Sequence, residues 1–360
     1  MHLSALLSLL LAARLAAQQK APAPFQVALD ISADGRLVAT CGDKVRVFEF
    51  ASGKPHREFA DGPSRCLAFS PAAKDALAVG HEDGIIRLHD ATKDGPPREF
   101  KGHTGWVMSL AFDKTGKWLA ATSQQYGNEA KKLDELGQFK LWDVTGGKAV
   151  KTIDVKGGRV NAAAFSDDGK LVAFCRSAPG DDGDATLEVF RPDPWEKVAS
   201  VKLPAGGLKG TPFGVATQFL PGGKRLMVGG GVCVPLTAAE VFPYKSGCRT
   251  TGLLWAVELG DKPAAKLVEE PRRGYFNALA ISPDGKRYVT HTESRENSAT
   301  YVSVRELEGN KTVWEGVDGQ AAYGIRFTPD GRHVTCIRFR QIRVYDAADG
   351  NALRLIDVAK

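Results

Sequence analysis

Hydrophobic and polar positions along this chain follow a pattern that recurs seven times. Each copy has an apolar segment, a tight polar turn that ends in a basic residue, and a second apolar segment. The turns occupy residues 32–36, 70–74, 113–117, 166–170, 220–224, 282–286 and 328–332. Pro, Asp and Gly in such turns favour the backbone dihedral angles of a hairpin. Each copy therefore predicts two antiparallel strands joined by its turn.

A third segment of alternating character follows each hairpin. These segments are residues 45–48, 86–89, 139–142, 187–190, 253–255, 302–304 and 342–345. A period of two with β-branched and aromatic residues is typical of a half-buried strand. A weaker fourth strand follows, for example at residues 148–153 and 353–358. Four antiparallel strands in each of seven copies predict an all-β, seven-bladed β-propeller, with residues 25–360 as one domain.

The third copy resembles a WD40 repeat. It contains Gly102 and His103, an apolar strand that begins at Trp106, and the pair Trp142 and Asp143. The resemblance extends over residues 25–360 and implies a propeller whose surface binds proteins. Ala121 stands where that family usually places a serine. We therefore expect tight apolar packing, rather than the family's hydrogen-bond network of His, Ser, Asp and Trp, to hold most blades.

The N-terminus carries a short apolar run at residues 3–13, followed by the small residues Ala16 and Ala17. This pattern predicts a cleaved signal peptide at residues 1–17 and a disordered leader at residues 18–24, so we expect export to the periplasm or the cell exterior. An uncleaved amphipathic anchor is the alternative. No other segment is apolar enough to span a membrane.

Composition narrows the class of partner. The chain is 43% hydrophobic and 25% charged, as soluble globular proteins are. Loss of Arg14 with the signal peptide lowers the formal net charge from +6 to +5, and the basic residues are spread along the chain. We therefore expect a monomer that binds a protein or peptide and does not bind nucleic acid.

Six cysteines divide into two groups. Cys41, Cys66, Cys175 and Cys336 lie in strand-like apolar segments and are expected to be buried thiols. Cys233 and Cys248 lie in one long insertion, and an oxidising compartment favours a disulfide between them.

Motifs for catalysis and cofactor binding are missing from the sequence. Residues 229–231 are a run of glycine, interpreted as a strand end that enters a long loop, without the Lys-Ser/Thr of a phosphate-binding loop. The histidines are isolated, and the acidic residues at 181–184 are interpreted as a solvated turn rather than a calcium site. We expect a non-enzymatic protein without metal or cofactor. The alternative is a propeller enzyme, lactonase-like or a metal-assisted hydrolase, with its site in the central funnel.

Insertions between the second and third strands are concentrated in copies three to six, at residues 123–138, 176–185, 229–252 and 291–299. Because these copies are consecutive, we expect the insertions to form a raised crescent on one face. Residues 128–136 predict a short helix. Drift in loop length is the alternative explanation. The candidate partner-binding residues are Tyr126, Leu133, Leu136, Val234, Leu236, Phe242, Tyr244 and Arg295. The leading interpretation is a scaffold for a protein or peptide, and a surface module without a discrete site is a further one.

Overall fold

The computed structural model describes residues 26–73, 75–127, 134–177, 185–235, 248–268, 272–273, 275–293, 300–317, 324–338 and 340–358. These residues form strands and turns and contain no helix. The predicted signal peptide and leader lie outside this part of the chain. No helix within it is long and apolar enough to cross a membrane.

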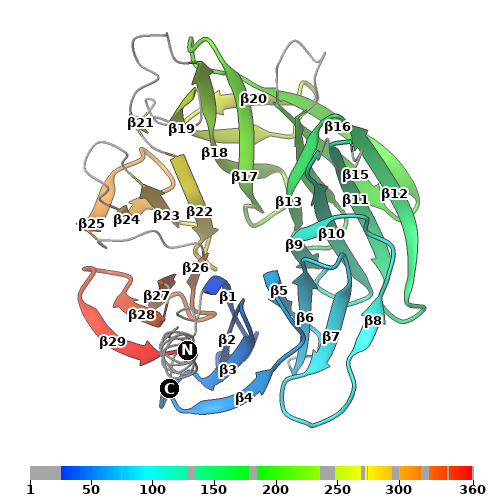
Figure 1. Cartoon of the computed structure of the whole chain (residues 1–360). Coiled ribbons are helices and arrows are strands. Elements are labelled where there is room, and N and C mark those ends of the chain that lie inside the picture. Colours follow the sequence, from blue (N-terminus) through cyan, green and yellow to red (C-terminus); the bar gives the residue numbers. More distant parts are fainter. Residues whose placement is uncertain are drawn as a thin grey trace, which may run out of the picture.

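Seven antiparallel sheets are arranged in a ring, which confirms the predicted seven-bladed propeller (Figure 1). Each sheet is one blade, and its first strand in the sequence is the innermost. Blade 1 contains β1 (Gln26–Ile31), β2 (Leu37–Gly42), β3 (Val45–Glu49) and β4 (Pro55–Phe59). Blade 2 contains β5 (Ser64–Phe69), β6 (Ala76–His81), β7 (Ile86–Asp90) and β8 (Arg98–Phe100). Blade 3 contains β9 (Trp106–Phe112), β10 (Trp118–Gln125), β11 (Leu136–Asp143) and β12 (Lys148–Lys156).

The later blades repeat this order. Blade 4 contains β13 (Arg159–Phe165), β14 (Val172–Ser177), β15 (Ala185–Pro192) and β16 (Trp195–Leu203). Blade 5 contains β17 (Thr211–Phe219), β18 (Arg225–Pro235), β19 (Cys248–Glu258) and β20 (Ala264–Leu267), with β21 (Arg272–Arg273) paired to β19. Blade 6 contains β22 (Tyr275–Ile281), β23 (Arg287–Glu293), β24 (Thr300–Glu306) and β25 (Thr312–Val317). Blade 7 contains β26 (Gly324–Phe327), β27 (His333–Arg338), β28 (Gln341–Asp346) and β29 (Ala352–Asp357).

The chain direction gives the ring two distinct faces. The turns between first and second strands and between third and fourth strands lie on one face, called here the turn face. The second strands end and the third strands begin on the opposite face, where the first strands also begin. We call that side the insertion face, because the described strand ends that flank the four predicted insertions lie there.

The hydrogen bonds within the hairpin turns explain why the turn sequence recurs. In blade 1, Ser32 Oγ donates to Asp34 Oδ1 at 2.7 Å and accepts a hydrogen bond from the backbone N–H of Leu37. Asp34 Oδ1 also accepts the backbone N–H of Arg36, and Asp34 Oδ2 accepts its guanidinium. Blades 4, 6 and 7 repeat the bonds from hydroxyl to aspartate and from backbone to aspartate. A hydroxyl, an aspartate two residues later and a flexible glycine are therefore what this turn requires.

The hydrophobic core lies between blades rather than within them. The described residues form seven buried apolar clusters, and each cluster joins two neighbouring blades. One of them joins Ile337, Ile342 and Ile356 of blade 7 to Leu29 and Phe48 of blade 1. A single blade therefore has an apolar face that only its neighbours cover, as repeat architectures require.

The ring closes without a shared strand, because all four strands of blade 7 come from the C-terminal end of the chain. Instead, a side chain from the outer strand of one blade donates to a backbone carbonyl of the next blade. The pairs are Arg57 with Thr92, Arg98 with Thr145, Trp314 with Ala347, and Arg354 with Ala51. The four donors occupy equivalent positions in their sheets, because each is paired with the equivalent residue of the third strand. The paired residues are Val47, Leu88, Val304 and Val344, respectively. The interface between blades 7 and 1, called here the closing seam, therefore uses the same contact as three other interfaces between neighbouring blades.

Two expectations about the insertions are wrong in detail. Much of the insertions in blades 3 and 5 is strand, because β10 and β11 extend to Gln125 and Leu136, and β18 extends to Pro235. The glycines at 229–231 pair with both neighbouring strands, and a Cβ on Gly230 would meet the carbonyl oxygen of Phe213 at 1.9 Å. This run of glycine therefore permits close strand approach and does not begin a loop.

The predicted helix at residues 128–136 is wrong at its C-terminal end. Residues 134 and 135 have no helical structure, and Leu136 is the first residue of β11. Residues 128–133 lie outside the described part of the chain.

Candidate functional site

A row of alternating arginine and aromatic side chains crosses the insertion face over blades 2, 3 and 4. Arg65 Cζ lies 4.5 Å from the centre of the Trp106 ring. The rings of Trp106 and Tyr126 meet edge to face with centroids 5.3 Å apart. Arg159 Cζ lies 5.9 Å from the centre of the Tyr126 ring. We call these four residues the aromatic–arginine row.

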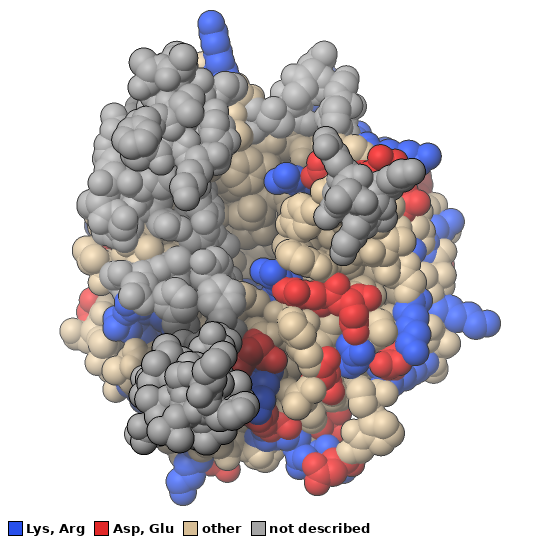
Figure 2. All heavy atoms as spheres, in the orientation of Figure 1, with Lys and Arg blue, Asp and Glu red and all other residues tan. Residues whose placement is uncertain are grey.

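Strand direction places the row at the mouth of the central channel. Arg65, Trp106 and Arg159 are at the beginning of the inner strands β5, β9 and β13, and Tyr126 directly follows β10. Inner strands start on the insertion face, so these side chains come from three blades to one rim. Figure 2 shows a hollow near the middle of the ring, with acidic and basic side chains beside it.

Two glutamates hold the arginines of the row. Arg65 Nε lies 2.7 Å from a carboxylate oxygen of Glu82, and Arg159 Nε lies 2.8 Å from one of Glu135. Exposed ion pairs of this kind contribute about 0–1 kcal/mol to stability. Tyr126 is 44% exposed, and the Arg159 side chain is 54% exposed. The side chains of the row are therefore held in place by ion pairs and are open to solvent. These ion pairs contribute little to the stability of the ring.

A buried polar pair lies in the blade that carries Trp106. Ser123 Oγ lies 2.7 Å from His103 Nδ1, and the Trp142 ring packs with its centroid 6.1 Å from that of His103. Burial, with a further contribution from Lys140, lowers the pKa of His103 to about 3, so the imidazole is neutral at pH 7. Ala121 does not remove this contact, because Ser123 lies on the same face of β10 two residues later. The network does not extend to Trp142, whose Nε1 is buried without a hydrogen-bond partner among the described residues.

The central channel has a cavity of about 360 Å³. Small apolar residues of the inner strands provide much of its lining, and Arg65 and Arg326 add positive charge. Within the part of the chain that the structure describes, no three His, Cys, Asp or Glu side chains are grouped so that they could hold a metal ion. The acidic residues at 181–184 lie outside that part.

The predicted partner-binding residues have different environments. Tyr126 belongs to the aromatic–arginine row. Leu136 is half-buried at the start of β11, and Val234 packs against the core between blades 4 and 5. The remaining candidates lie outside the described residues: Leu133, Leu236, Phe242, Tyr244 and Arg295.

Sequence reasoning missed three members of the row, namely Arg65, Trp106 and Arg159. Each occupies the first or second position of an inner strand, where most other blades have a small or apolar residue. That shared position was a usable signal, since a ring brings equivalent positions of neighbouring blades to one rim.

The four strand cysteines are buried and belong to no disulfide, as predicted: Cys41, Cys66, Cys175 and Cys336. Burial raises the pKa of each of the Cys41 and Cys175 thiols to about 12, which keeps both protonated and unreactive. Cys233 and Cys248 lie near the ends of the paired strands β18 and β19, with Cys233 opposite Thr250 and Cys248 opposite Pro235.

A family model confirms the resemblance that blade 3 suggested. The model, described as WD domain, G-beta repeat, matches residues 95–127, which include His103, Trp106 and Ser123. The chain carries a WD40 repeat in blade 3. Its seven blades of four antiparallel strands agree with that assignment.

Curated relatives of this WD40-repeat protein match only part of it. Ribosome assembly protein 4 of Chaetomium thermophilum is 32% identical over 97 residues, which are 27% of this chain and 17% of that protein. Target of rapamycin complex subunit wat1 of Schizosaccharomyces pombe is 29% identical over 137 residues, which are 37% of this chain and 40% of that protein. The chain therefore spans less than half the length of these relatives.

A solved structure shares the fold of this WD40-repeat protein over nearly all of the chain. A chain of the Kuenenia stuttgartiensis hydrazine synthase superposes with a TM-score of 0.71, covering 92% of this chain and 98% of that one. The two are 15% identical in sequence. At that identity the likeness shows the propeller fold alone.

Proposed function

We propose that this WD40-repeat protein is a non-enzymatic scaffold that binds a protein or peptide on its insertion face. The aromatic–arginine row is the observation that carries the proposal. Trp, Tyr and Arg are the residues that most often dominate binding energy at protein interfaces. Here they come from three blades to one exposed rim, and their ion pairs with glutamate fix the guanidinium groups before a partner arrives.

The predicted insertions support a binding site on the same face of the ring. Residues 126–135, 178–184, 236–247 and 294–299 follow second strands and precede third strands in four consecutive blades, and the described strand ends that flank them lie on the same side as the row. A partner centred on the row is therefore flanked by the proposed crescent on one side of the ring. The relatives fit a scaffold role, since one is named for ribosome assembly and another as a subunit of a complex.

The test compares capture of proteins from an extract of the host by three forms of the chain. The variant Trp106→Ala/Tyr126→Ala removes both rings of the row. The variant Leu355→Ser replaces a 57% exposed leucine on β29, the outer strand of blade 7, and serves as the matched control. Thermal melting and near-UV circular dichroism establish that all three forms are folded.

We expect the wild type and Leu355→Ser to capture the same proteins, and Trp106→Ala/Tyr126→Ala to lose at least one of them by tenfold or more. Equal capture by all three folded forms contradicts the proposal, because the rings of the row then contribute nothing to binding.

We also propose that the chain is exported after cleavage near residue 17 and that Cys233 and Cys248 form a disulfide. Support for the disulfide comes from the strand register, in which the two cysteines are two residues out of alignment on paired strands, and from Cys233 not being among the free thiols. Closing a 15-residue loop in this way stabilises the fold by about 3 kcal/mol. Intact-mass analysis with and without reductant, together with N-terminal sequencing of the secreted protein, tests both. Two alkylatable thiols at these positions contradict the disulfide, and an intact N-terminus contradicts cleavage.

A further inference from the structure

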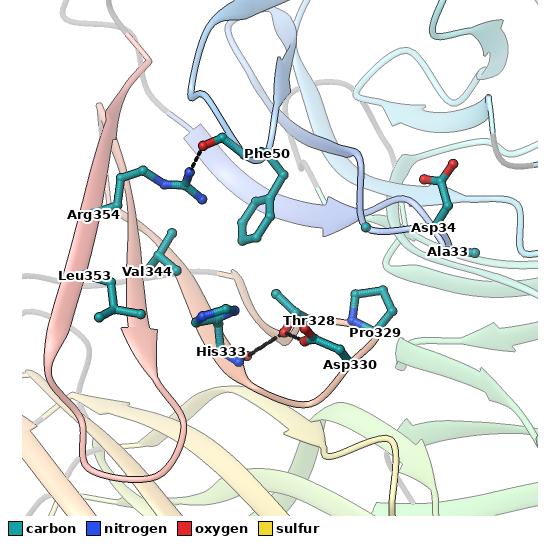
Figure 3. A pocket seen from close by; sticks show the side chains of 12 residues that line it. Ala33, Asp34, Phe50, Thr328, Pro329, Asp330, His333, Val344, Leu353 and Arg354 are labelled. Atoms are coloured by element: carbon teal, nitrogen blue, oxygen red, sulfur yellow. Dashed lines mark hydrogen bonds between the residues drawn. The ribbon is translucent and has the colours of Figure 1, made fainter.

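A pocket of about 630 Å³ lies on the turn face at the seam where blade 7 meets blade 1. Residues of the β1–β2 turn and the loop after β3 form one wall, and the β26–β27 turn with strands β28 and β29 forms the other. In Figure 3 Phe50 and His333 lie on opposite walls, Arg354, Val344 and Leu353 are grouped at one end, and Asp34 lies at the other. A cavity of this volume is of the size that small-molecule ligands occupy.

The floor of the pocket is apolar, and one apolar side chain at its edge is uncovered. Phe50 and Val344 are buried in the closing seam. Leu353 lines the pocket and is 52% exposed. Pro329 adds a further apolar surface from the turn of blade 7. A ligand with an apolar body would therefore lie on this buried apolar floor and remove Leu353 from water, which is favourable.

Arg354 brings a positive charge that lacks a carboxylate partner among the described residues. Its guanidinium donates to the carbonyl of Ala51 and lies with Cζ 4.9 Å from the centre of the Phe50 ring, while its Nε is buried without a hydrogen-bond partner. Burial lowers the pKa of Arg354, and no nearby acid opposes that shift. The equivalent Arg57 of blade 1 has such a partner in Asp94.

The two aspartates of the pocket are already engaged within their own turns. Asp34 accepts hydrogen bonds from Ser32 and Arg36, and Asp330 accepts them from Thr328 and the backbone of Arg332. Asp34 also lies at the opposite end of the pocket from Arg354 (Figure 3). The charged end of the pocket is therefore positive, and a partly desolvated charge is stabilised by an opposite charge with hydrogen bonds.

We propose that this closing-seam pocket binds a small amphipathic carboxylate. Its apolar body lies against Phe50, Val344 and Leu353, and its carboxylate accepts hydrogen bonds from the N–H groups of Arg354 that Ala51 leaves open. His333, on the facing wall, contacts the body of the ligand. The site is separate from the aromatic–arginine row, which lies on the other face of the ring.

The neighbouring seam provides an internal comparison. The pocket between blades 1 and 2 is about 810 Å³ and contains Arg98 at the position equivalent to Arg354. Its lining contains Asp34, Asp75 and Asp90, one carboxylate more than the Asp34 and Asp330 of the closing-seam pocket, so a bound carboxylate meets more negative charge there. We therefore assign the site to the closing seam alone.

The experiment uses 4-phenylbutyrate as the probe, with 4-phenylbutyramide as its uncharged analogue and 4-phenylbutylamine as its cationic one. Saturation-transfer NMR and calorimetry measure binding to the full chain. We expect saturable binding of the carboxylate, with at least fivefold weaker binding of the amide and the amine. Absence of saturable carboxylate binding, or equal binding of the amide or the amine, overturns the proposal.

Two pairs of variants assign the binding to this pocket. Leu353→Asp places a negative charge beside Arg354, whereas Leu355→Asp places one on the same strand outside the pocket, and both leucines are exposed. We expect a tenfold loss of carboxylate affinity for Leu353→Asp and less than a twofold loss for Leu355→Asp. Arg354→Met should lower the carboxylate affinity at least tenfold. Arg57→Met, which removes the same contact between blades 1 and 2, should change that affinity by less than twofold. Equal effects within either pair place the binding elsewhere and overturn the proposal.

Discussion

Asp30 and Arg326 are 296 residues apart in the chain, and Arg326 Nε donates to Asp30 Oδ1 at 3.0 Å. The other oxygen of the same carboxylate accepts the backbone N–H of Phe69 at 2.9 Å. Asp30 therefore joins the inner strands of blades 7, 1 and 2 at the point where the ring closes. Closure by side chains of this kind takes the place of a shared strand.

Asp30→Ala should destabilise the ring, because it leaves the Phe69 N–H and the Arg326 guanidinium without their acceptor. Loss of such hydrogen bonds costs about 1–3 kcal/mol. Denaturant unfolding measures the change. Glu196→Gln, which removes an exposed ion pair with Arg191, serves as the control and should change stability by less than about 0.5 kcal/mol. Equal stability of the two variants would show that closure does not depend on Asp30.

The turn glycines should tolerate substitution in proportion to the space around them. Gly285 has φ +68°, and a Cβ there would lie 2.8 Å from Pro221 of the preceding blade. Gly207 has φ +79° with no atom within 4 Å of such a Cβ. Gly207→Ala should therefore cost only the left-handed backbone strain of about 1–2 kcal/mol, and Gly285→Ala about 1–3 kcal/mol more from the steric contact. Equal melting temperatures for the two variants would refute the packing of turn on turn.

Acid should weaken the fold through two buried histidines. Burial lowers the pKa of His103 to about 3 and that of His291 to about 4. In the unfolded chain histidine titrates near 6.5, so below that pH the unfolded state binds protons that the folded state does not. The stability contribution is complete above pH 6.5 and falls by about 1.4 kcal/mol per pH unit for each histidine as the pH drops toward the folded pKa.

Denaturant unfolding between pH 7 and pH 4.5 measures this slope. His103→Asn should make it shallower, whereas His56→Gln, at an exposed position in β4, should leave it unchanged. A wild-type stability that is flat over this range would show that the histidines accept protons in the folded ring.

Sequence reasoning reached the blades because their determinants are local. A hydroxyl, an aspartate and a glycine within one turn specify a hairpin, and alternation specifies the third strand, so neither needs distant contacts. The C-terminal end of the helix predicted at residues 128–136 was wrong because an acidic segment with leucines fits a helix by propensity, whereas Leu136 pairs with Gln125 and Lys156 in the sheet. Tertiary pairing overrides local propensity there.

The site was harder to predict because the ring assembles it. Arg65, Trp106 and Arg159 are about 40 to 50 residues apart, and each is unremarkable in its own blade. Ser123, the hydrogen-bond partner of His103, was missed for a simpler reason. Ser123 lies one pleat beyond the position that the family template assigns, on the same side of the strand.

Ser123→Ala should therefore destabilise blade 3, since it removes the hydrogen bond between Ser123 Oγ and the buried His103 Nδ1. The expected cost is about 1–3 kcal/mol. Ala121→Ser, which restores the residue usual in the family, should not recover that loss in the double variant. Full recovery of stability in the double variant would show that a serine at position 121 can hold His103 as well as Ser123 does.

Site-specific photocrosslinking tests the central claim most directly. A photoreactive phenylalanine analogue replaces Tyr126 in the aromatic–arginine row or, as the control, Leu355 on the outer strand β29, and the protein is irradiated in its own host. The account predicts a discrete crosslinked species from position 126 that position 355 does not give. Identical adducts from both positions, or none from position 126 in a folded protein, would contradict a binding site on the insertion face.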